Sequence, residues 1–241
     1  MADLRVPSVQ HLARNWNQQP TAIARALVQL ARNPPHFNYN PLYAAVQDML
    51  VLGVPYDEVE KGIRRIKREN VRQNLLSVLP LIRNHFSDVS PDFYQTVGKR
   101  YYPVGRGLMV PFEPPLIYGV GGQLYFPWFS FWRTNPLAKE RLALFVTLVD
   151  EILMQDPDLE TARFEILDFS CPGPKQERTL RVVDARDIIR LDDRRKVEML
   201  ECFAEGYFQA VAELRGAPAS PRPEERPDSR SPDPDQPGLF D

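Results

Sequence analysis

The sequence of 241 residues contains few of the residues that build metal and redox sites. It has two cysteines, Cys171 and Cys202, and three histidines, His11, His36 and His85. A structural zinc site takes four Cys or His ligands at close spacing, whereas these five residues are scattered, so no zinc site is expected. Two cysteines fit a reducing compartment. The sequence predicts a protein without a metal ion or cofactor, and we see no Ser-His-Asp or Cys-His arrangement in it.

Long hydrophobic runs are also missing. No stretch of eighteen apolar residues occurs, so we expect no transmembrane helix and no membrane partner. The first residues, MADLRVPSVQHLARNW, lack the apolar core of a signal peptide. The chain is 43% hydrophobic and 26% charged, which is ordinary for a globular protein with a real core. We therefore expect a cytoplasmic protein.

Charge is distributed unevenly although the net charge is only −2. Residues 1–110 hold 14 Lys and Arg against 8 Asp and Glu, a balance of +6, and residues 111–241 hold 16 against 24, a balance of −8. A basic front half favours contact with nucleic acid, while an acidic back half disfavours it. An uneven solvated surface explains the same distribution.

Residues 1–98 are predicted to form a helical region. Apolar residues at helical spacing, with Pro or Asn before them and Pro or Gly after them, indicate helices over 20–33 and 40–53. The segment 55–70 has acids early and bases late, which suits a helix dipole. Residues 71–86 continue as a helix that Pro80 is expected to kink or divide. The sequence SPDFYQTVG predicts one more short helix at 90–98.

Residues 99–215 are predicted to form a mixed region with the order β-β-β-α-β-β-α. Strands are expected around 108–112, 116–119, 123–132, 162–170 and 178–185, with the last two antiparallel. Helices are expected at 135–155, where Asn135 is the cap, and at 194–216. The fold class is therefore α+β, in three parts: a helical region (1–98), an α+β region (99–215) and a tail (216–241).

Two motifs in the mixed region have structural and functional interpretations. GVGG at 119–122 lacks the Lys-Ser/Thr of a phosphate loop and precedes a strand, so we interpret it as a hairpin turn. YFPWFSFW at 125–132 places aromatics on both faces of a strand. Such aromatics stack on bases when they are exposed, but a central strand covered on both sides explains the pattern, and we favour that explanation.

A basic segment, KGIRRIKRENVR at 61–72, carries six bases and one acid. It is a candidate for contact with a phosphate backbone, because such contacts are made by Lys and Arg. Glu60 with Arg64, and Arg65 with Glu69, are equally well spaced for ion pairs on a solvated helix face. The candidate nucleic-acid contacts are Arg64, Arg65, Lys67, Arg68 and Arg72.

Four charged residues suggest a second hypothesis, a metal-dependent nuclease. Glu165 and Asp168 lie on one predicted strand, with Glu113 and Lys175 as candidate partners. The order β-β-β-α-β resembles the core of PD-(D/E)xK nucleases. That resemblance implies an acid followed by acid-x-Lys on the next strand, and the corresponding segment here, QLYFPWFSFW, has neither. An active enzyme is the less favoured alternative.

The tail contains seven prolines, six acids and three arginines in residues 216–241. Such a composition buries too little apolar surface to offset the entropy of ordering, so we expect disorder. It ends with QPGLFD, in which Leu239 and Phe240 are large apolar residues. Apolar residues at the end of a flexible tether are typical of a short linear motif that a partner buries.

The segment Gln236-Pro237-Gly238-Leu239-Phe240 resembles the peptide by which bacterial polymerases and repair proteins bind the DNA sliding clamp, Q-x-x-L-F. The resemblance implies polar contacts from Gln236 and insertion of Leu239 and Phe240 into an apolar pocket of the clamp. Pro237 departs from the usual Leu. The favoured hypothesis is a non-enzymatic accessory protein of DNA replication or repair. A protein-interaction module unrelated to DNA is the remaining alternative.

Overall fold

The computed structural model describes residues 4–35, 38–114 and 116–216 and has an α+β fold, as predicted. The helices are α1 (Val9–Asn15), α2 (Pro20–Arg32), α3 (Asn40–Leu50), α4 (Tyr56–Arg64), α5 (Glu69–Phe86), α6 (Glu140–Leu153), the 3-10 helix η1 (Ala185–Asp187) and α7 (Asp193–Gly216). The strands are β1 (Phe93–Gln95), β2 (Arg100–Gly105), β3 (Leu108–Phe112), β4 (Ile117–Val120), β5 (Gln123–Ser130), β6 (Arg163–Asp168) and β7 (Arg181–Asp184).

The central sheet has five strands in the order β1-β4-β5-β6-β7. Strands β5 and β6 are parallel, because α6 connects them as a crossover, and every other pair in this sheet is antiparallel. The predicted antiparallel pairing of the last two strands is confirmed. Strands β2 and β3 form a separate two-stranded ribbon.

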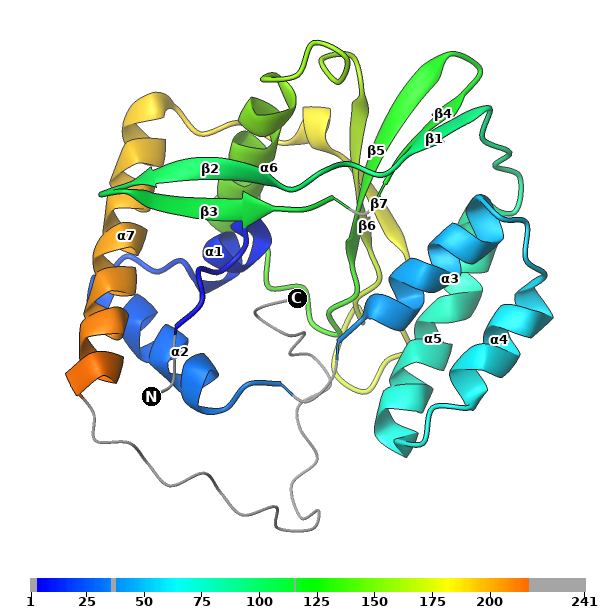
Figure 1. Cartoon of the computed structure of the whole chain (residues 1–241), viewed down its shortest axis with the longest axis horizontal. Coiled ribbons are helices and arrows are strands. Elements are labelled where there is room, and N and C mark those ends of the chain that lie inside the picture. The colour runs from blue at the N-terminus through cyan, green and yellow to red at the C-terminus, as the bar shows by residue number, and fades with distance from the viewer. Residues whose placement is uncertain (1–3, 36–37, 115, 217–241) are drawn as a thin grey trace.

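Helices cover both faces of the sheet and bury two apolar clusters (Figure 1). The first cluster joins α1, α2, α6, α7 and the β2–β3 ribbon to one face. The second joins α3, α4 and α5 to the other face. Each cluster therefore contains helices from residues 1–98 and strands from the mixed region, so the two regions of the sequence share their cores.

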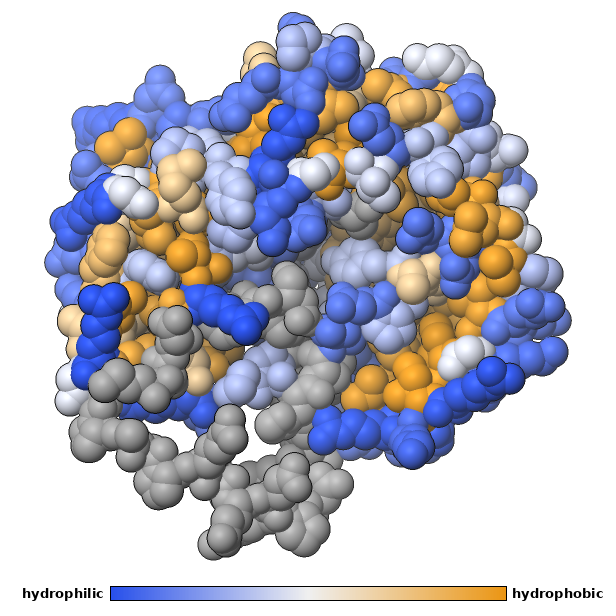
Figure 2. Space-filling model, viewed as in Figure 1, coloured by the Kyte–Doolittle hydropathy of each residue, from blue (hydrophilic) through white to orange (hydrophobic). Residues whose placement is uncertain are grey.

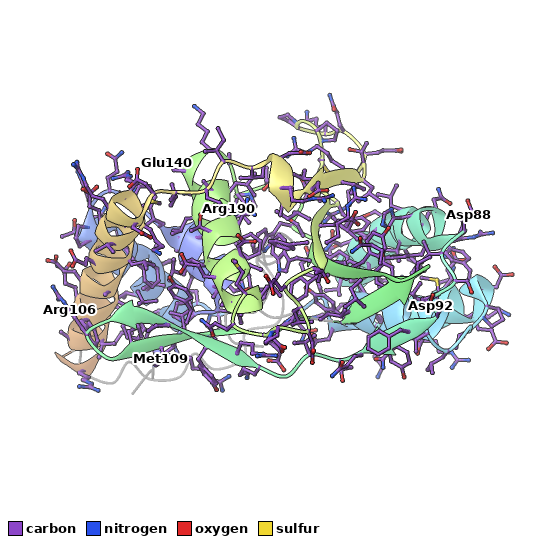
Figure 3. The ribbon with its side chains drawn as sticks, turned by 90° about the horizontal axis from the view of Figure 1, so that it is seen from above. Asp88, Asp92, Arg106, Met109, Glu140 and Arg190 are labelled. Atoms are coloured by element: carbon purple, nitrogen blue, oxygen red, sulfur yellow. The ribbon has the colours of Figure 1, made fainter. Side chains whose placement is uncertain are left out.

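Strands β1 and β2 form one arm of a long hairpin, and β3 and β4 form the other arm. The pair β1–β4 belongs to the central sheet, and the pair β2–β3 is the ribbon. Cα partners in β1–β4, such as Phe93 and Gly119, have residue numbers that sum to 212, and so do partners in β2–β3 from Arg100 and Phe112 to Pro103 and Met109. The register is thus continuous across an unpaired break at 96–99 and 113–116. Figure 3 shows the two ends of this hairpin, from Asp92 to Arg106.

The turn between β4 and β5 is the hairpin turn that the glycines predicted. Gly121 and Gly122 have φ values of 57° and 80°, the left-handed conformation of a type I′ turn. Asp92 stabilises this turn, because its carboxylate accepts a hydrogen bond from the Gly121 backbone N–H at 2.9 Å. A side chain at Gly119 would meet Asp92 Oδ1 at 3.1 Å, so strand β1 can approach closely only at a glycine.

The predicted helix at 90–98 is wrong. Residues Phe93–Gln95 form β1, which pairs with β4, and Asp92 binds the neighbouring turn instead of capping a helix. The local Ser-Pro-Asp signal is overridden by pairing with a strand that lies more than twenty residues away. Strand β2 and helix α1 were also not predicted.

The helix predicted at 135–155 is shorter than expected, because α6 begins at Glu140. Asn135 accepts a hydrogen bond from the Leu137 N–H at 2.8 Å in a turn, so it does not cap the helix. Helix α5 continues through Pro80, which does not divide it. Among the described helices, none combines the length and the apolarity that crossing a membrane requires.

Candidate functional site

A pocket of about 640 Å³ lies beside the edge of β5 that faces β4. Strand β4 has four residues and pairs with Gln123, Leu124 and Tyr125, whereas β5 continues to Ser130. Among the described strands, the second half of β5 therefore has a ladder partner only in β6. The pocket occupies the place that a longer β4 would fill.

Prolines explain why β4 is short. The sequence between β3 and β4 is Glu113-Pro114-Pro115-Leu116, and a proline has no N–H for a ladder hydrogen bond. This segment lies opposite residues 96–99 at the break of the long hairpin, and both segments contribute to the pocket wall. The break in the hairpin and the free edge of β5 thus open the same cavity.

The pocket wall combines aromatic side chains with polar ones. Helix α1 contributes from one face of the sheet and helix α3 from the other. The aromatic lining residues are Tyr39, Tyr43, Tyr94, Trp128, Phe129, Phe131 and Trp132. The polar lining residues are Gln10, His11, Asn38, Asn40, Gln47, Thr96 and Glu113. This combination is typical of a small-molecule site.

Two buried polar atoms at this pocket lack a hydrogen-bond partner within the described residues. They are Oε1 of Gln10 and Nδ1 of His11, which are neighbours on α1. The His11 side chain belongs to a residue that is only 5% exposed, and its ring packs against Trp132 with 5.8 Å between centroids. A buried polar atom without a partner is costly, so these two atoms are candidates for hydrogen bonds to a ligand.

The interior of the pocket is uncharged near neutral pH. Burial and, second, the positive charge of Arg14 lower the pKa of His11 to about 3, so the imidazole is neutral. Burial raises the pKa of Tyr43, so its hydroxyl is protonated. The charged lining residue, Glu113, is 58% exposed and pairs with Lys99 at 3.3 Å. The described lining residues therefore offer no buried cation to an anionic ligand.

The backbone of β5 also faces the pocket. The Tyr43 hydroxyl donates a hydrogen bond to the Phe129 carbonyl at 3.5 Å, while the Ser130 carbonyl accepts from Phe169 on the β6 side. Alternate residues of a strand point their N–H and C=O groups to opposite edges. The Phe129 N–H consequently points to the same edge of β5 as its carbonyl.

Arg178 holds the base of this region together, and sequence reasoning did not single it out. It is 7% exposed, and its guanidinium donates to the carbonyls of Phe131 (3.0 Å), Trp132 (3.2 Å) and Phe169 (2.8 Å). It also donates to Asn74 Oδ1 at 2.6 Å, and Asn74 donates to the Tyr39 hydroxyl at 3.3 Å. The pocket wall at 131–132 is thereby fixed to α5 and to β6.

The aromatic strand at 125–132 is a central strand, as predicted. Trp128 packs in the first apolar cluster, and Phe129 and Phe131 pack in the second. The same side chains also form one wall of the pocket. Sequence reasoning missed four site residues, because their convergence depends on the placement of α1 and α3. They are Gln10, His11, Tyr39 and Tyr43.

The basic segment, residues 61–72, includes the turn between α4 and α5. This turn lies at the lower edge of the layer formed by α3, α4 and α5, where Figure 2 shows strongly hydrophilic residues. Arg64 pairs with Glu60 at 2.5 Å as predicted, and Arg72 pairs with Glu69 and donates to the Ile66 carbonyl. The predicted pair of Arg65 with Glu69 is wrong, because α4 ends at Arg64 and the two residues do not share a helix. Exposed bases at this turn are Lys61, Arg64, Arg65, Lys67 and Arg68.

The acids of the nuclease hypothesis do not converge. Glu165 and Asp168 are an odd number of residues apart on β6, so their side chains point to opposite faces of the sheet. Asp168 accepts hydrogen bonds from Asn135 at 2.8 Å and from the Ser170 N–H at 3.1 Å. Glu113 pairs with Lys99, and Lys175 lies in the turn after β6.

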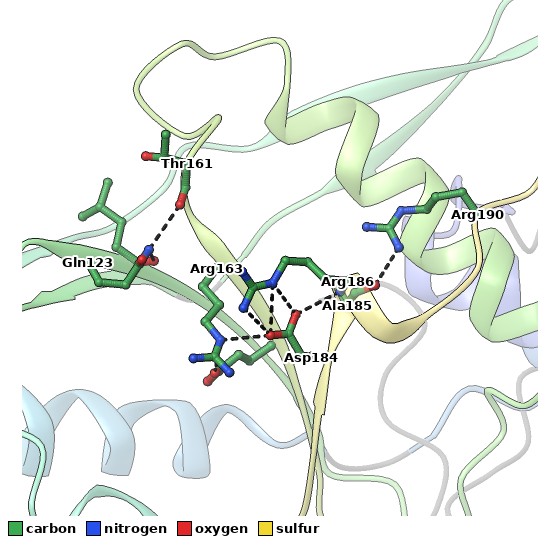
Figure 4. A network of polar contacts seen from close by, with 9 residues as sticks. Gln123, Thr161, Arg163, Asp184, Ala185, Arg186 and Arg190 are labelled. Atoms are coloured by element: carbon green, nitrogen blue, oxygen red, sulfur yellow. Dashed lines mark hydrogen bonds and ion pairs between the residues drawn. The ribbon is translucent and has the colours of Figure 1, made fainter.

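Glu165 belongs instead to an ion network across β6 and β7, of which Figure 4 shows Arg163, Asp184 and Arg186. Arg163 pairs with Glu165 at 3.1 Å and with Asp184 at 3.0 Å, and Arg186 binds Asp184 at 2.7 Å. Burial raises the pKa of Glu165, whereas the hydrogen bond from Arg186 lowers the pKa of Asp184 to about 2. Each carboxylate in this network is already satisfied by an arginine.

Within the described residues, no three His, Cys, Asp or Glu side chains gather as a metal site requires. The clamp-motif residues Gln236, Leu239 and Phe240 lie outside the described residues. A scan against protein-family models finds no match, and a search of curated proteins finds none either.

Proposed function

We propose that this protein is a non-enzymatic accessory protein of DNA replication or repair in the bacterial cytoplasm. It is recruited to the DNA polymerase sliding clamp by its C-terminal segment, with Gln236 as the polar contact and Leu239 and Phe240 as the apolar contacts. The observation that carries the proposal is the sequence QPGLF at 236–240, which resembles the clamp-binding peptide.

The position of the motif supports the proposal. Helix α7 ends at Gly216, so 19 residues separate the folded part from Gln236. A chain of that length spans at most about 65 Å when fully extended. This tether is long enough for the motif to reach a clamp while the folded part contacts something else.

The energetics of the motif rest on two side chains. Leu239 and Phe240 are the large apolar residues of the segment 217–241. Complete burial of such a side chain contributes about 1.5–3 kcal/mol. A flexible segment loses conformational entropy when it binds, so the expected dissociation constant is in the micromolar range, on the order of 1–10 μM.

Titration of a purified bacterial sliding clamp with a peptide of residues 228–241 tests the proposal. Changing both Leu239→Ala and Phe240→Ala should weaken binding at least about a hundredfold, since about 1.4 kcal/mol corresponds to a factor of ten. Gln236→Ala should weaken it by roughly fivefold, the effect of one polar contact. Asp233→Ala is the matched control in the same tail and should change binding little.

Two outcomes contradict the proposal. One is the absence of binding at several hundred micromolar clamp, measured by fluorescence anisotropy. The other is equal binding of the wild-type and double-alanine peptides. In either case an interaction module unrelated to DNA becomes the better hypothesis for this chain.

Direct contact with DNA is a second candidate function, favoured by the exposed bases at the turn between α4 and α5. Arg65→Glu with Lys67→Glu should reduce DNA binding at least about tenfold at low salt, and binding should fall steeply with added salt because it depends on counterion release. Arg106→Glu, at the tip of the β2–β3 ribbon, is the control. Binding that changes equally in both variants would assign the contact to another surface.

A further inference from the structure

We propose that the pocket beside β5 binds an uncharged nucleobase, presented as a nucleoside or as an unpaired base. The proposal rests on the pocket geometry and does not depend on the clamp. It follows from four properties of the cavity: its aromatic walls, its two unpartnered polar atoms, its free strand edge and the lack of a buried cation among its described lining residues.

The aromatic walls select a flat ring. Tyr43 and Phe131 lie 5.1 Å apart at 66°, and Trp128 and Trp132 lie 5.5 Å apart at 62°. In such a pair the edge of one ring covers a face of the other, and Phe131, Trp128 and Trp132 are each less than 5% exposed. The aromatic surface open to a planar ligand therefore comes mainly from Tyr94, which is 47% exposed, and from the half-buried Tyr43. Base stacking on aromatic side chains is the common way in which proteins hold an unpaired base. A cavity of 640 Å³ lies within the range that accommodates a small organic ligand.

The polar atoms select a ring that both donates and accepts hydrogen bonds. Gln10 Oε1 is an acceptor, and it meets the need of an exocyclic amino group. His11 Nδ1 is neutral and can accept or donate according to its tautomer. The Phe129 N–H on the free edge of β5 donates to a ring nitrogen. Adenine and cytosine carry an amino group beside a ring acceptor, which matches this set.

The described lining residues supply no positive charge to a buried phosphate, and the nearby Arg14 guanidinium lies over the Trp132 ring, 5.3 Å from its centre. His11 is uncharged above about pH 3, and the charge of Glu113 is balanced by Lys99 at 3.3 Å. A nucleotide would therefore have to leave its phosphate outside the cavity. The uncharged nucleoside is consequently the appropriate probe.

Calorimetric titration of the full chain with adenosine tests the inference. We expect binding on the order of 0.1 mM, the affinity of an efficient ligand with about twenty heavy atoms. Purine riboside, which lacks the amino group, should bind about tenfold more weakly because the Gln10 acceptor stays unpartnered. His11→Phe, which keeps a ring but removes Nδ1, should weaken adenosine binding by a similar factor, about tenfold.

A second variant tests the same pocket with a substitution at an exposed residue, whereas His11→Phe changes a buried one. Ala44 is an exposed residue at the pocket mouth, so Ala44→Trp should block the cavity while leaving the fold intact. Ala138→Trp, at an exposed residue elsewhere, is the matched control and should bind adenosine as the wild type does.

The inference is overturned by any of three results. The first is no heat of binding up to about 2 mM adenosine, roughly twentyfold above the expected constant. The second is equal binding by wild type and Ala44→Trp. The third concerns the double variant Leu239→Ala with Phe240→Ala, measured without nucleoside. If its tryptophan emission is shifted relative to the wild type, the pocket is occupied by the chain's own C-terminal segment.

Discussion

At the scale of single residues, the structure depends on buried polar groups that are not paired with an opposite charge. Arg178 is the clearest case, since its guanidinium donates hydrogen bonds to three carbonyls and one amide oxygen, all of them uncharged. Hydrogen bonds from a charged donor are stronger than neutral ones, and they compensate for part of the desolvation of the arginine. His11 is the opposite case, a buried ring that stays neutral.

Arg178→Met should lower the free energy of unfolding by about 3 kcal/mol or more. The substitution keeps much of the side chain's volume but leaves several buried acceptors without a donor. Chemical denaturation measures the loss. Arg186→Met is the comparison, because Arg186 is 70% exposed and should cost less than about 1 kcal/mol. If both variants lost a similar free energy of unfolding, Arg178 would not be the residue that holds this region together.

His11 should make the protein less stable as the pH falls. Burial lowers its folded-state pKa to about 3, while in the unfolded chain it is near 6.5. Between these values the unfolded state binds the additional proton, so the free energy of unfolding decreases by up to about 1.4 kcal/mol per pH unit below about pH 6.5.

Urea denaturation of wild type and His11→Phe at about pH 6.5, 5.5 and 4.5 measures this contribution. The variant should show a flatter dependence on pH by about 1 kcal/mol per unit. His85→Phe should flatten it less, because His85 is only partly buried. Parallel curves for wild type and His11→Phe would contradict the assigned pKa.

At the scale of elements, the contact between α2 and α7 depends on a glycine. A Cβ at Gly206 would lie 2.7 Å from Ile23 Cβ and 2.7 Å from the Pro20 carbonyl oxygen. Real side-chain contacts are essentially never that close, so α2 packs directly on the backbone of α7. These helices bring the start and the end of the folded part together (Figure 1).

Gly206→Ala should therefore destabilise the protein by about 1–3 kcal/mol, despite the better helix propensity of alanine. Gly62→Ala is a matched control, because a methyl group at Gly62 in α4 would meet no atom of the described chain within 4 Å, and it should gain up to about 1 kcal/mol. Thermal melting compares the two. A stabilising Gly206→Ala would mean that the two helices move apart at little cost.

The elements with strong local signals were predictable from the sequence, and those defined by distant pairing were not. Apolar spacing and terminal Pro or Gly located α2 and α3, and the GVGG turn located the β4–β5 hairpin. Residues 93–95 form a strand only because β4 offers a partner. The pocket was unpredictable for the same reason, since His11 and Tyr43 meet only after α1 and α3 settle on opposite faces of the sheet.

At the scale of the whole molecule, the first apolar cluster reaches Leu214 near the end of α7, and the sequence of residues 217–241 offers few apolar side chains. Removal of residues 217–241 should consequently leave a cooperative unfolding transition with a melting temperature within about 2 °C of the full chain. Calorimetry of the two proteins checks this. A decrease of several degrees would show that the segment packs on the folded part.

The continuous register of the long hairpin limits how its length can change during evolution. Four residues separate β1 from β2, and four separate β3 from β4. One inserted residue in either segment would offset the two strands and break the shared register. One inserted residue in each segment would exchange the inner and outer faces of the ribbon, moving the buried Tyr102 outward and the exposed Met109 inward. Insertions and deletions should therefore be tolerated at the Gly105–Gly107 tip, while the crossing segments that wall the pocket keep their length.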